Sequence, residues 1–445
     1  MKNILKYVLT FVVMVVLGIG ALYLVTFIPK VMIKENVEIS SEVLLEQGEK
    51  FRKKSLTRDV LFHNSTDAIM LNIVYGLDET DRLDGILKAR RNYLEDSNQK
   101  VVRDLTGNLK SDYSGFKMTK ELEGLVNGNY SQRVFEYARY WHGYIIILRI
   151  MLVFFDVVEI RIILQLLVLT LLTMLAYLLV IKHKKSKEAL IILLAFFMLD
   201  LTTWSYNIQG MFAMLIALIV SNLIAIGVIN SKKLSYALFI TGIMTAYFDF
   251  LTVPLVTCLL PIIVNNIVRC EDEKFSKIFI RFVLNVISWA VGYALFWGTK
   301  WIISDILTDT NIIKTSLEQI LIRIGIKDND KPMDKLIVNS LIENFKLLFN
   351  PLNLFVSSLF ITIGIFNIIN YGIKNVYNKN CFVYHMSIIA VVLWYVVCAD
   401  HSSLHSFFTY RLLIPLIISV FLMAVQYDKE NIKFKFKKEK IDDRN

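Results

Sequence analysis

The sequence predicts an all-α polytopic membrane protein with about ten transmembrane helices. Hydrophobic residues make up 55% of the 445 residues, charged residues make up 20%, and the mean hydropathy is +0.53. A soluble protein carries about 25% charged residues and cannot bury this much apolar surface. Several apolar runs reach about 20 residues, the length that crosses a bilayer as a helix. These observations exclude soluble enzymes, disordered chains and collagens, and the runs lack the alternation of a transmembrane barrel.

The net charge of +10 does not indicate a nucleic-acid partner, because most basic residues flank apolar runs. The four cysteines form no C-x-x-C pair, so the sequence predicts neither a zinc site nor a disulfide framework. Their expected role is packing within the apolar runs, at Cys258, Cys270, Cys381 and Cys398.

The first expected span is the run 7–28, which follows Lys2 and Lys6. It is too long for the apolar region of a signal peptide, so we expect an uncleaved anchor with its N-terminus inside. The other expected spans are 162–181, 189–204, 209–229, 236–250, 252–268, 278–298, 351–371, 386–399 and 409–426.

The positions of lysine and arginine orient these spans. The connections expected inside all carry basic residues, whereas the short outer hairpins 205–208, 249–252 and 399–408 carry none. The positive-inside rule then places both termini in the cytoplasm. The segment 143–155 is only about 13 apolar residues long and contains Arg149, so we expect an interfacial helix on the outer surface. The basic inner connections are 182–187, 231–233, 269–277, 374–379 and the tail at 433–438.

Two long polar segments, 30–142 and 302–350, are expected outside, where they form one small helical extracytoplasmic cap. Apolar residues at helical spacing predict helices in the first segment, with Thr80 or Asp81 capping the second of them. The stretch 98–129 is expected to be a loop. The resulting division of the chain is 1–29 (first span), 30–142 (cap), 143–301 (interfacial helix and spans two to seven), 302–350 (second outer loop), 351–426 (last three spans) and 427–445 (basic tail).

Polar residues of the spans and hairpins gather at the outer side, and such residues suggest function by default. Several have alternative explanations. Tyr140 and Trp141 equally suit an aromatic belt, and Arg139 and Arg149 suit lipid headgroups. Two histidines four residues apart are weak grounds for zinc. The candidates for substrate binding are Arg139, Tyr140, Trp141, His142, Arg149, Asp200, Asp249, His401, His405, Tyr410 and Arg411.

Asp67 is the candidate catalytic residue, as a general base in the outer cap. It opens an apolar helix, so the alternative is that Ser65 or Thr66 caps this helix and Asp67 favours its positive end. Asp249 has a similar alternative as the cap of the following span. No P-loop, G-x-S-x-G or H-E-x-x-H motif is present.

Three segments resemble a little-characterised bacterial family within the GT-C superfamily of membrane glycosyltransferases. They are NSTDAIMLN (64–72), YARYWHGY (137–144) and HSFFTYR (405–411). The long outer loop directly after the first span resembles that superfamily too. The resemblance implies a plasma-membrane enzyme that takes a sugar from a polyprenyl-phosphate carrier and passes it to a cell-surface glycan or lipid on the outer face.

The resemblance also implies roles for the candidates. Arginines suit the phosphate leaving group, so Arg139, Arg149 and Arg411 are expected near it, with His142, His401 or His405 donating further bonds. Asp67 would deprotonate the acceptor, followed in preference by Asp200 and Asp249. Some related enzymes hold a divalent cation, Mg²⁺ or Mn²⁺, at such acids.

Two alternatives to this function stay open. A transporter or flippase of a lipid-linked glycan needs inner-side sites as well as outer ones. A polysaccharide polymerase or ligase usually has its large loop late in the chain, whereas here the larger loop is 30–142.

Overall fold

The computed structural model describes residues 2–55, 58–94, 118–268, 274–308, 311–324, 332–376, 379 and 381–426, and the statements below concern these residues. The structure is 79% helical. The basic tail 427–445, Cys270 and part of the connection 269–277 lie outside the described residues.

The protein is a helical membrane protein. By length and composition, six described helices can cross a membrane, which confirms the predicted class but not the predicted number of spans. Three shorter apolar helices coincide with further predicted runs, and a fourth, α8 (Ser186–Met198), ends before the predicted limit at 204. The six are Ile4–Val25 within α1 (Lys2–Val25), α7 (Val157–Ile181), α9 (Ile208–Ile226), α12 (Phe275–Leu307), α15 (Pro351–Tyr371) and Ser406–Val425, which contains α20 (Leu413–Val425). The three are α10 (Leu234–Phe248), α11 (Pro254–Val268) and α17 (Cys381–Val397).

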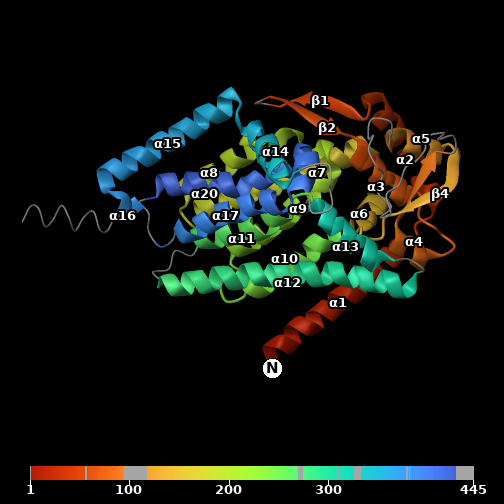
Figure 1. Ribbon diagram of the computed structural model, residues 1–445, viewed down its shortest axis with the longest axis horizontal. Coiled ribbons are helices and arrows are strands. Elements are labelled where there is room, and N and C mark those ends of the chain that lie inside the picture. Colours follow the sequence, from red (N-terminus) through yellow and green to blue (C-terminus); the bar gives the residue numbers. More distant parts are fainter. Residues whose placement is uncertain are drawn as a thin grey trace, which may run out of the picture.

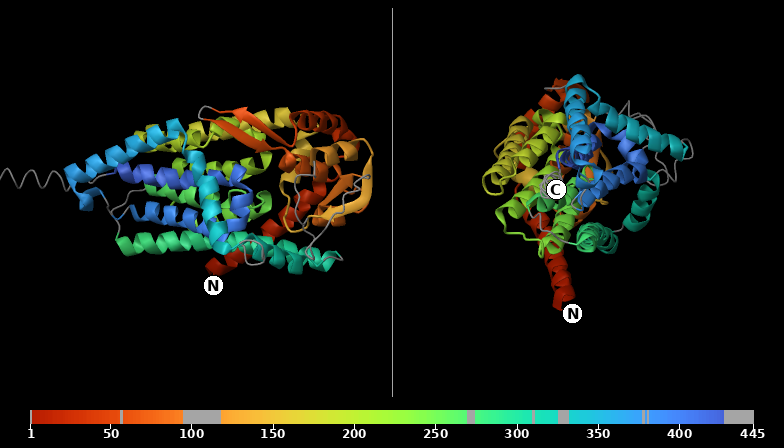
Figure 2. Two further views of the ribbon diagram at one scale, coloured as in Figure 1. Left: turned by 45° about the horizontal axis from the view of Figure 1, so that its top comes forward. Right: turned by 90° about the vertical axis from the view of Figure 1, so that its left-hand side faces the viewer.

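Helices α8 to α12, α17 and α20 lie alongside one another, and the cap, the described part of residues 30–142, covers one end of this bundle (Figure 1). The N-terminal part of α1 and much of α15 diverge from the bundle (Figure 2). Both helices therefore offer most of their apolar surface to lipid, since 17% of their membrane windows is buried. At its tightest crossing, α10 meets α12 through Gly242 and Gly292.

The predicted helical cap contains four described helices, but it also contains two β-hairpins that were not predicted. Strand β1 (Lys50–Lys54) pairs antiparallel with β2 (Asp59–His63), and β3 (Arg90–Leu94) pairs antiparallel with β4 (Tyr130–Glu136). Phe51 lies opposite Phe62, and Arg91 lies opposite Phe135. Short strands carrying several charges give little apolar alternation, so the sequence pattern did not reveal them. The cap helices are α2 (Lys30–Gln47), α3 (Ser65–Tyr75), α4 (Arg82–Lys88) and α5 (Met118–Val126).

Two local predictions for the cap had different outcomes. Asp81 caps α4, accepting a hydrogen bond of 3.1 Å from the backbone N–H of Asp84, as predicted. The expected loop at 98–129 was wrong for its second half, because 118–126 forms α5; residues 98–117 lie outside the described ranges.

The described part of the polar segment 302–350 is also helical. Its helices α13 (Ile312–Arg323) and α14 (Met333–Phe345) are followed by a 3₁₀ turn, Lys346–Leu348. Helix α14 packs against α17 and against α18 (Ala399–Leu404), where Asn344 donates a hydrogen bond of 2.8 Å to the carbonyl oxygen of Ser402. This segment therefore stabilises the hairpin that carries the predicted histidines.

The predicted interfacial segment forms the helix α6 (Tyr144–Met151), which is too short to cross a bilayer. Its Arg149 is fully buried and donates hydrogen bonds to the carbonyl oxygens of Ile28 (2.7 Å) and Val74 (2.7 Å) and to the carboxylate of Glu79 (3.0 Å). These carbonyls lie just after α1 and near the end of α3. Arg149 thus ties the cap to the first span, and its donors are already used.

We expect Arg149→Met to loosen the cap. The substitution removes the donors of two carbonyl oxygens, that of Val74 buried and that of Ile28 partly buried, and an unsatisfied buried group costs about 1–3 kcal/mol. Limited proteolysis of the full-length protein in detergent should show faster cleavage within 30–142. Arg90→Met is the matched control, because the partly exposed pair of Arg90 with Asp84 contributes at most about 1 kcal/mol. Equal cleavage of the two variants would contradict this role.

Candidate functional site

Five charged residues from distant parts of the chain meet where the cap joins the bundle. We name them the arginine–aspartate cluster: Arg58, Asp67, Arg161, Asp200 and Arg411. They come from the β1–β2 turn, α3, the start of α7, the turn after α8 and the segment before α20. Three guanidinium groups thus face two carboxylates, and the cluster carries excess positive charge.

Asp67 is fully buried in an ion pair with Arg161. Arg161 donates two hydrogen bonds to one carboxylate oxygen, at 3.1 and 2.7 Å, and the backbone N–H of Ile208 donates to the other at 3.1 Å. Burial raises the pKa of Asp67, whereas Arg161 opposes this shift. Asp67 therefore holds the N-terminus of α9 next to α7.

The predicted capping by Ser65 or Thr66 was wrong, because Asn64 is the N-cap of α3 and makes no side-chain capping bond. The hydroxyl of Thr66 instead accepts a hydrogen bond of 2.9 Å from Asn207. This contact joins α3 to the start of α9, beside Asp67.

Asp200 occupies a left-handed backbone position, with φ of 62°, directly after α8. Arg58 binds one oxygen of this carboxylate through two nitrogens, at 2.8 and 2.6 Å, and the hydroxyl of Ser55 donates to the other oxygen. The guanidinium of Arg58 also lies 5.3 Å from the ring centre of Tyr410. Asp200 thus anchors the first β-hairpin to the bundle.

Arg411 is fully buried and only partly satisfied. One terminal nitrogen donates a hydrogen bond of 3.3 Å to the carbonyl oxygen of Trp204, and the guanidinium lies 5.2 Å from the Trp204 ring centre. Its Nε and Nη1 find no hydrogen-bond partner among the described residues. Buried polar groups are normally hydrogen-bonded, so two unused donors of a buried cation fit a bound oxyanion.

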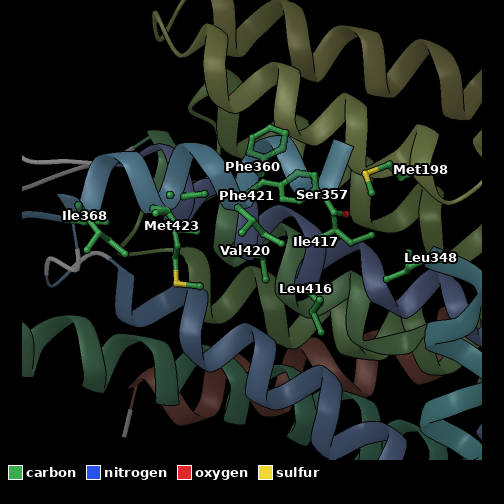
Figure 3. A pocket seen from close by; sticks show the side chains of 15 residues that line it. Met198, Leu348, Ser357, Phe360, Ile368, Leu416, Ile417, Val420, Phe421 and Met423 are labelled. Atoms are coloured by element: carbon green, nitrogen blue, oxygen red, sulfur yellow. The ribbon is translucent and has the colours of Figure 1, made fainter. Parts of the chain in front are cut away.

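The bundle also contains an apolar groove. It has a volume of about 320 Å³ and runs between α15, α20 and the end of α8 (Figure 3). Met198 and Leu348 lie toward one end, and Ile368 and Met423 lie toward the other. Met198 precedes Asp200 by two residues and Leu416 follows Arg411 by five, while neither charged residue lines the groove. Such a groove suits a hydrocarbon chain.

A second group of candidates lies at the hairpin after α17. The rings of His401 and His405 have centres 4.8 Å apart, in agreement with the expectation that they share a face. His401 donates from Nε2 to the carbonyl oxygen of Leu251 (2.8 Å), and Arg323 donates to Nε2 of His405 (3.3 Å). No described group of three or more His, Cys, Asp or Glu side chains is arranged to hold a metal ion.

Asp249 belongs to the turn between α10 and α11. Its carboxylate accepts hydrogen bonds from the backbone N–H of Thr252, at 2.9 Å, and from the Thr252 hydroxyl. Burial raises the pKa of Asp249 to about 7. The residue therefore orders its own hairpin.

The segment 137–144 joins the cap to α12. Trp141 is fully buried, not at a lipid surface, and donates a hydrogen bond of 2.7 Å to the carbonyl oxygen of Phe296. His142 bonds the carbonyl oxygen of Tyr137 at 2.6 Å, and burial lowers its pKa to about 3. Tyr140 stacks on Trp297, and the carbonyl oxygen of Arg139 accepts from Trp297 and Trp301. Trp141 and His142 are therefore placed as anchors.

The structure thus brings Asp67, Asp200, Tyr410 and Arg411 together and places Arg149 elsewhere. Sequence reasoning missed Arg58, Arg161 and Arg323. A signal existed only for Arg161, an ionisable residue at the edge of the apolar run 162–181. Arg58 and Arg323 lie in polar segments where charges are ordinary.

Comparisons with family models, curated proteins and solved structures found no match to this chain.

Proposed function

We propose that the protein is a glycosyltransferase of the bacterial plasma membrane, acting on its outer face. It moves a sugar from a polyprenyl-phosphate carrier to a cell-surface glycan or lipid. The proposed topology has ten spans, with both termini in the cytoplasm and the cap outside. The spans are α1, α7, α8, α9, α10, α11, α12, α15, α17 and α20.

The observation that carries this proposal is the position of Arg411. Its Nε and Nη1 are buried without hydrogen-bond partners among the described residues, and Leu416 and Ile417, which follow Arg411 in the sequence, line an apolar groove. A ligand that satisfies both features has an oxyanion at one end and a long hydrocarbon chain at the other. A polyprenyl phosphate has this chemistry, and its phosphate would accept hydrogen bonds from Nε and Nη1 of Arg411.

The proposed reaction is a single displacement. An acceptor hydroxyl bonds to the anomeric carbon while the bond from that carbon to the phosphate oxygen breaks, and the electron pair leaves with the phosphate. Arg411 stabilises the developing charge on the phosphate. We assign the acceptor proton to Asp67, whose pKa is raised by burial. In this step one Asp67 oxygen exchanges its hydrogen bond from Arg161 or Ile208 for the acceptor hydroxyl. No described group of three or more His, Cys, Asp or Glu side chains is arranged to hold Mg²⁺ or Mn²⁺, and the reaction is derived from the side chains alone.

The test compares undecaprenyl phosphate with undecaprenol, using full-length protein in nanodiscs. Only the phosphate should markedly raise the thermal unfolding temperature of the wild type. Arg411→Gln should weaken binding of the phosphate at least about tenfold, as expected for losing a charge-assisted bond. Arg411→Lys should bind the phosphate with an affinity between those of the wild type and Arg411→Gln, because lysine keeps the charge but not the paired donors. Arg90→Gln, which removes a cation of the cap away from the cluster, is the control. Equal binding of both lipids would contradict the proposal.

A further inference from the structure

The contacts of His401 and His405 fix which ring nitrogens carry protons. A carbonyl oxygen only accepts hydrogen bonds, so Nε2 of His401, at 2.8 Å from the carbonyl oxygen of Leu251, carries its proton. A guanidinium only donates, so Nε2 of His405, at 3.3 Å from Arg323, is unprotonated. The two neighbouring histidines therefore use opposite tautomers.

Burial favours the neutral form of both rings. Burial lowers the pKa of His401 to about 3 and that of His405 well below its usual value, and the nearby charge of Arg323 acts in the same direction. In a neutral imidazole one nitrogen is a donor and the other an acceptor. The remaining nitrogen, Nδ1, is then an acceptor in His401 and an N–H donor in His405.

Neither Nδ1 has a hydrogen-bond partner among the described residues, and both atoms are buried. His401 itself is 3% exposed. An orphaned donor and an orphaned acceptor thus belong to two neighbouring rings whose centres are 4.8 Å apart. A hydroxyl group complements this arrangement, because one oxygen can accept from His405 and donate to His401. An oxyanion does not fit, because the lone pair of His401 would repel it.

We infer that His401 and His405 bind one hydroxyl group of a neutral polyhydroxylated ligand. The surroundings support such a ligand: Phe408 stacks on His405, with ring centres 5.3 Å apart, and Phe407 stacks on His63 at 4.0 Å. Aromatic surfaces with a few placed polar groups are typical of small-molecule sites. His405 is half-buried, so the pair lies near the surface. If the proposed function holds, on which this identification rests, the ligand is the transferred or accepting sugar.

The test uses the difference between glutamine and asparagine as substitutes for histidine. A glutamine amide reaches the position of Nε2, whereas an asparagine amide reaches that of Nδ1. His401→Gln and His405→Gln therefore keep the bonds to Leu251 and Arg323 but lose the hydroxyl contacts. His401→Asn and His405→Asn keep the hydroxyl contacts but lose the bonds to Leu251 and Arg323.

Binding is measured by saturation-transfer NMR on full-length protein in nanodiscs, with glucose, galactose and N-acetylglucosamine as probes. At least one probe should bind, and each glutamine variant should weaken its binding about tenfold, the effect of losing one buried hydrogen bond. The asparagine variants should bind more tightly than the glutamine variants. The deoxy analogue lacking the recognised hydroxyl should bind wild type as weakly as the glutamine variants bind the parent sugar.

Three outcomes would overturn the inference: no probe binds, all four variants bind like wild type, or the asparagine variants are the weaker ones. The first two would mean that a resident water bridges the histidines, and the third that the residues are structural. Undecaprenyl phosphate binding, measured on the same proteins, separates this inference from the proposed function, because it depends on Arg411 and not on the histidines.

Discussion

Arg161→Met is expected to destabilise the protein by about 3–5 kcal/mol, because it leaves the buried carboxylate of Asp67 without its partner. The double variant Asp67→Asn/Arg161→Met should recover much of this loss, since a neutral amide needs no counter-charge. Thermal unfolding in detergent measures the stability of the single and the double variant. A double variant no more stable than Arg161→Met would show that the pair does not act as a unit.

The same variant gives a pH test with a defined sign. Without Arg161, burial alone acts on Asp67, so the pKa of its carboxyl is raised further in the folded state. When the pKa of a carboxyl is higher in the folded than in the unfolded protein, the folded protein is most stable with that carboxyl protonated. Its free energy of unfolding then falls as the pH rises above the pKa in the unfolded chain, which is about 4 for aspartate. Arg161→Met should therefore lie closer to wild type at acid pH than at neutral pH. A constant difference across that range would contradict the assignment.

Gly292→Ala is expected to separate α10 from α12. A methyl group at Gly292 would lie 2.2 Å from the backbone oxygen of Phe239, and one at Gly242 would lie 2.1 Å from that of Trp289. Backbone atoms cannot move aside without shifting a helix, so each substitution should cost about 3 kcal/mol or more, the upper range for overpacking.

Gly298→Ala is the matched control on the same helix, because nothing lies within 4 Å of a methyl group there. Alanine favours a helix over glycine by about 1 kcal/mol, so this variant should be as stable as wild type or slightly more stable. The unfolding temperatures of Gly242→Ala, Gly292→Ala and Gly298→Ala test whether α10 and α12 cross this closely. If Gly292→Ala and Gly298→Ala behave alike, the close crossing is not present.

Much of the membrane part could be predicted from the sequence. Each of the ten apolar runs coincides with at least part of a helix, because apolar length and bounding charges are local properties. The position of Asp200, Tyr410 and Arg411 at one end of the bundle could also be predicted, because alternate hairpins of a membrane bundle lie on the same side. The Asp81 cap followed from a local rule.

The pairings could not be predicted. Asp67 and Arg161 are separated by 94 residues, and Arg58 and Asp200 by 142. Nothing in either local sequence distinguishes a charge that will be buried in a pair from one that stays solvated. For the same reason Arg149 was expected to meet a substrate, although its donors hold the carbonyl oxygens of Ile28 and Val74.

The most direct test of the central claim is the surface glycan composition of a strain lacking this gene, complemented with wild type, Arg411→Gln or Asp67→Asn. Membrane levels of each protein are measured in parallel. The account predicts that deletion removes a sugar from the surface, that wild type restores it, and that stably inserted Arg411→Gln does not. Failure of stably inserted Asp67→Asn would support the proposed role of Asp67 as the base. An unchanged glycan after deletion, or full restoration by Arg411→Gln, would contradict the account.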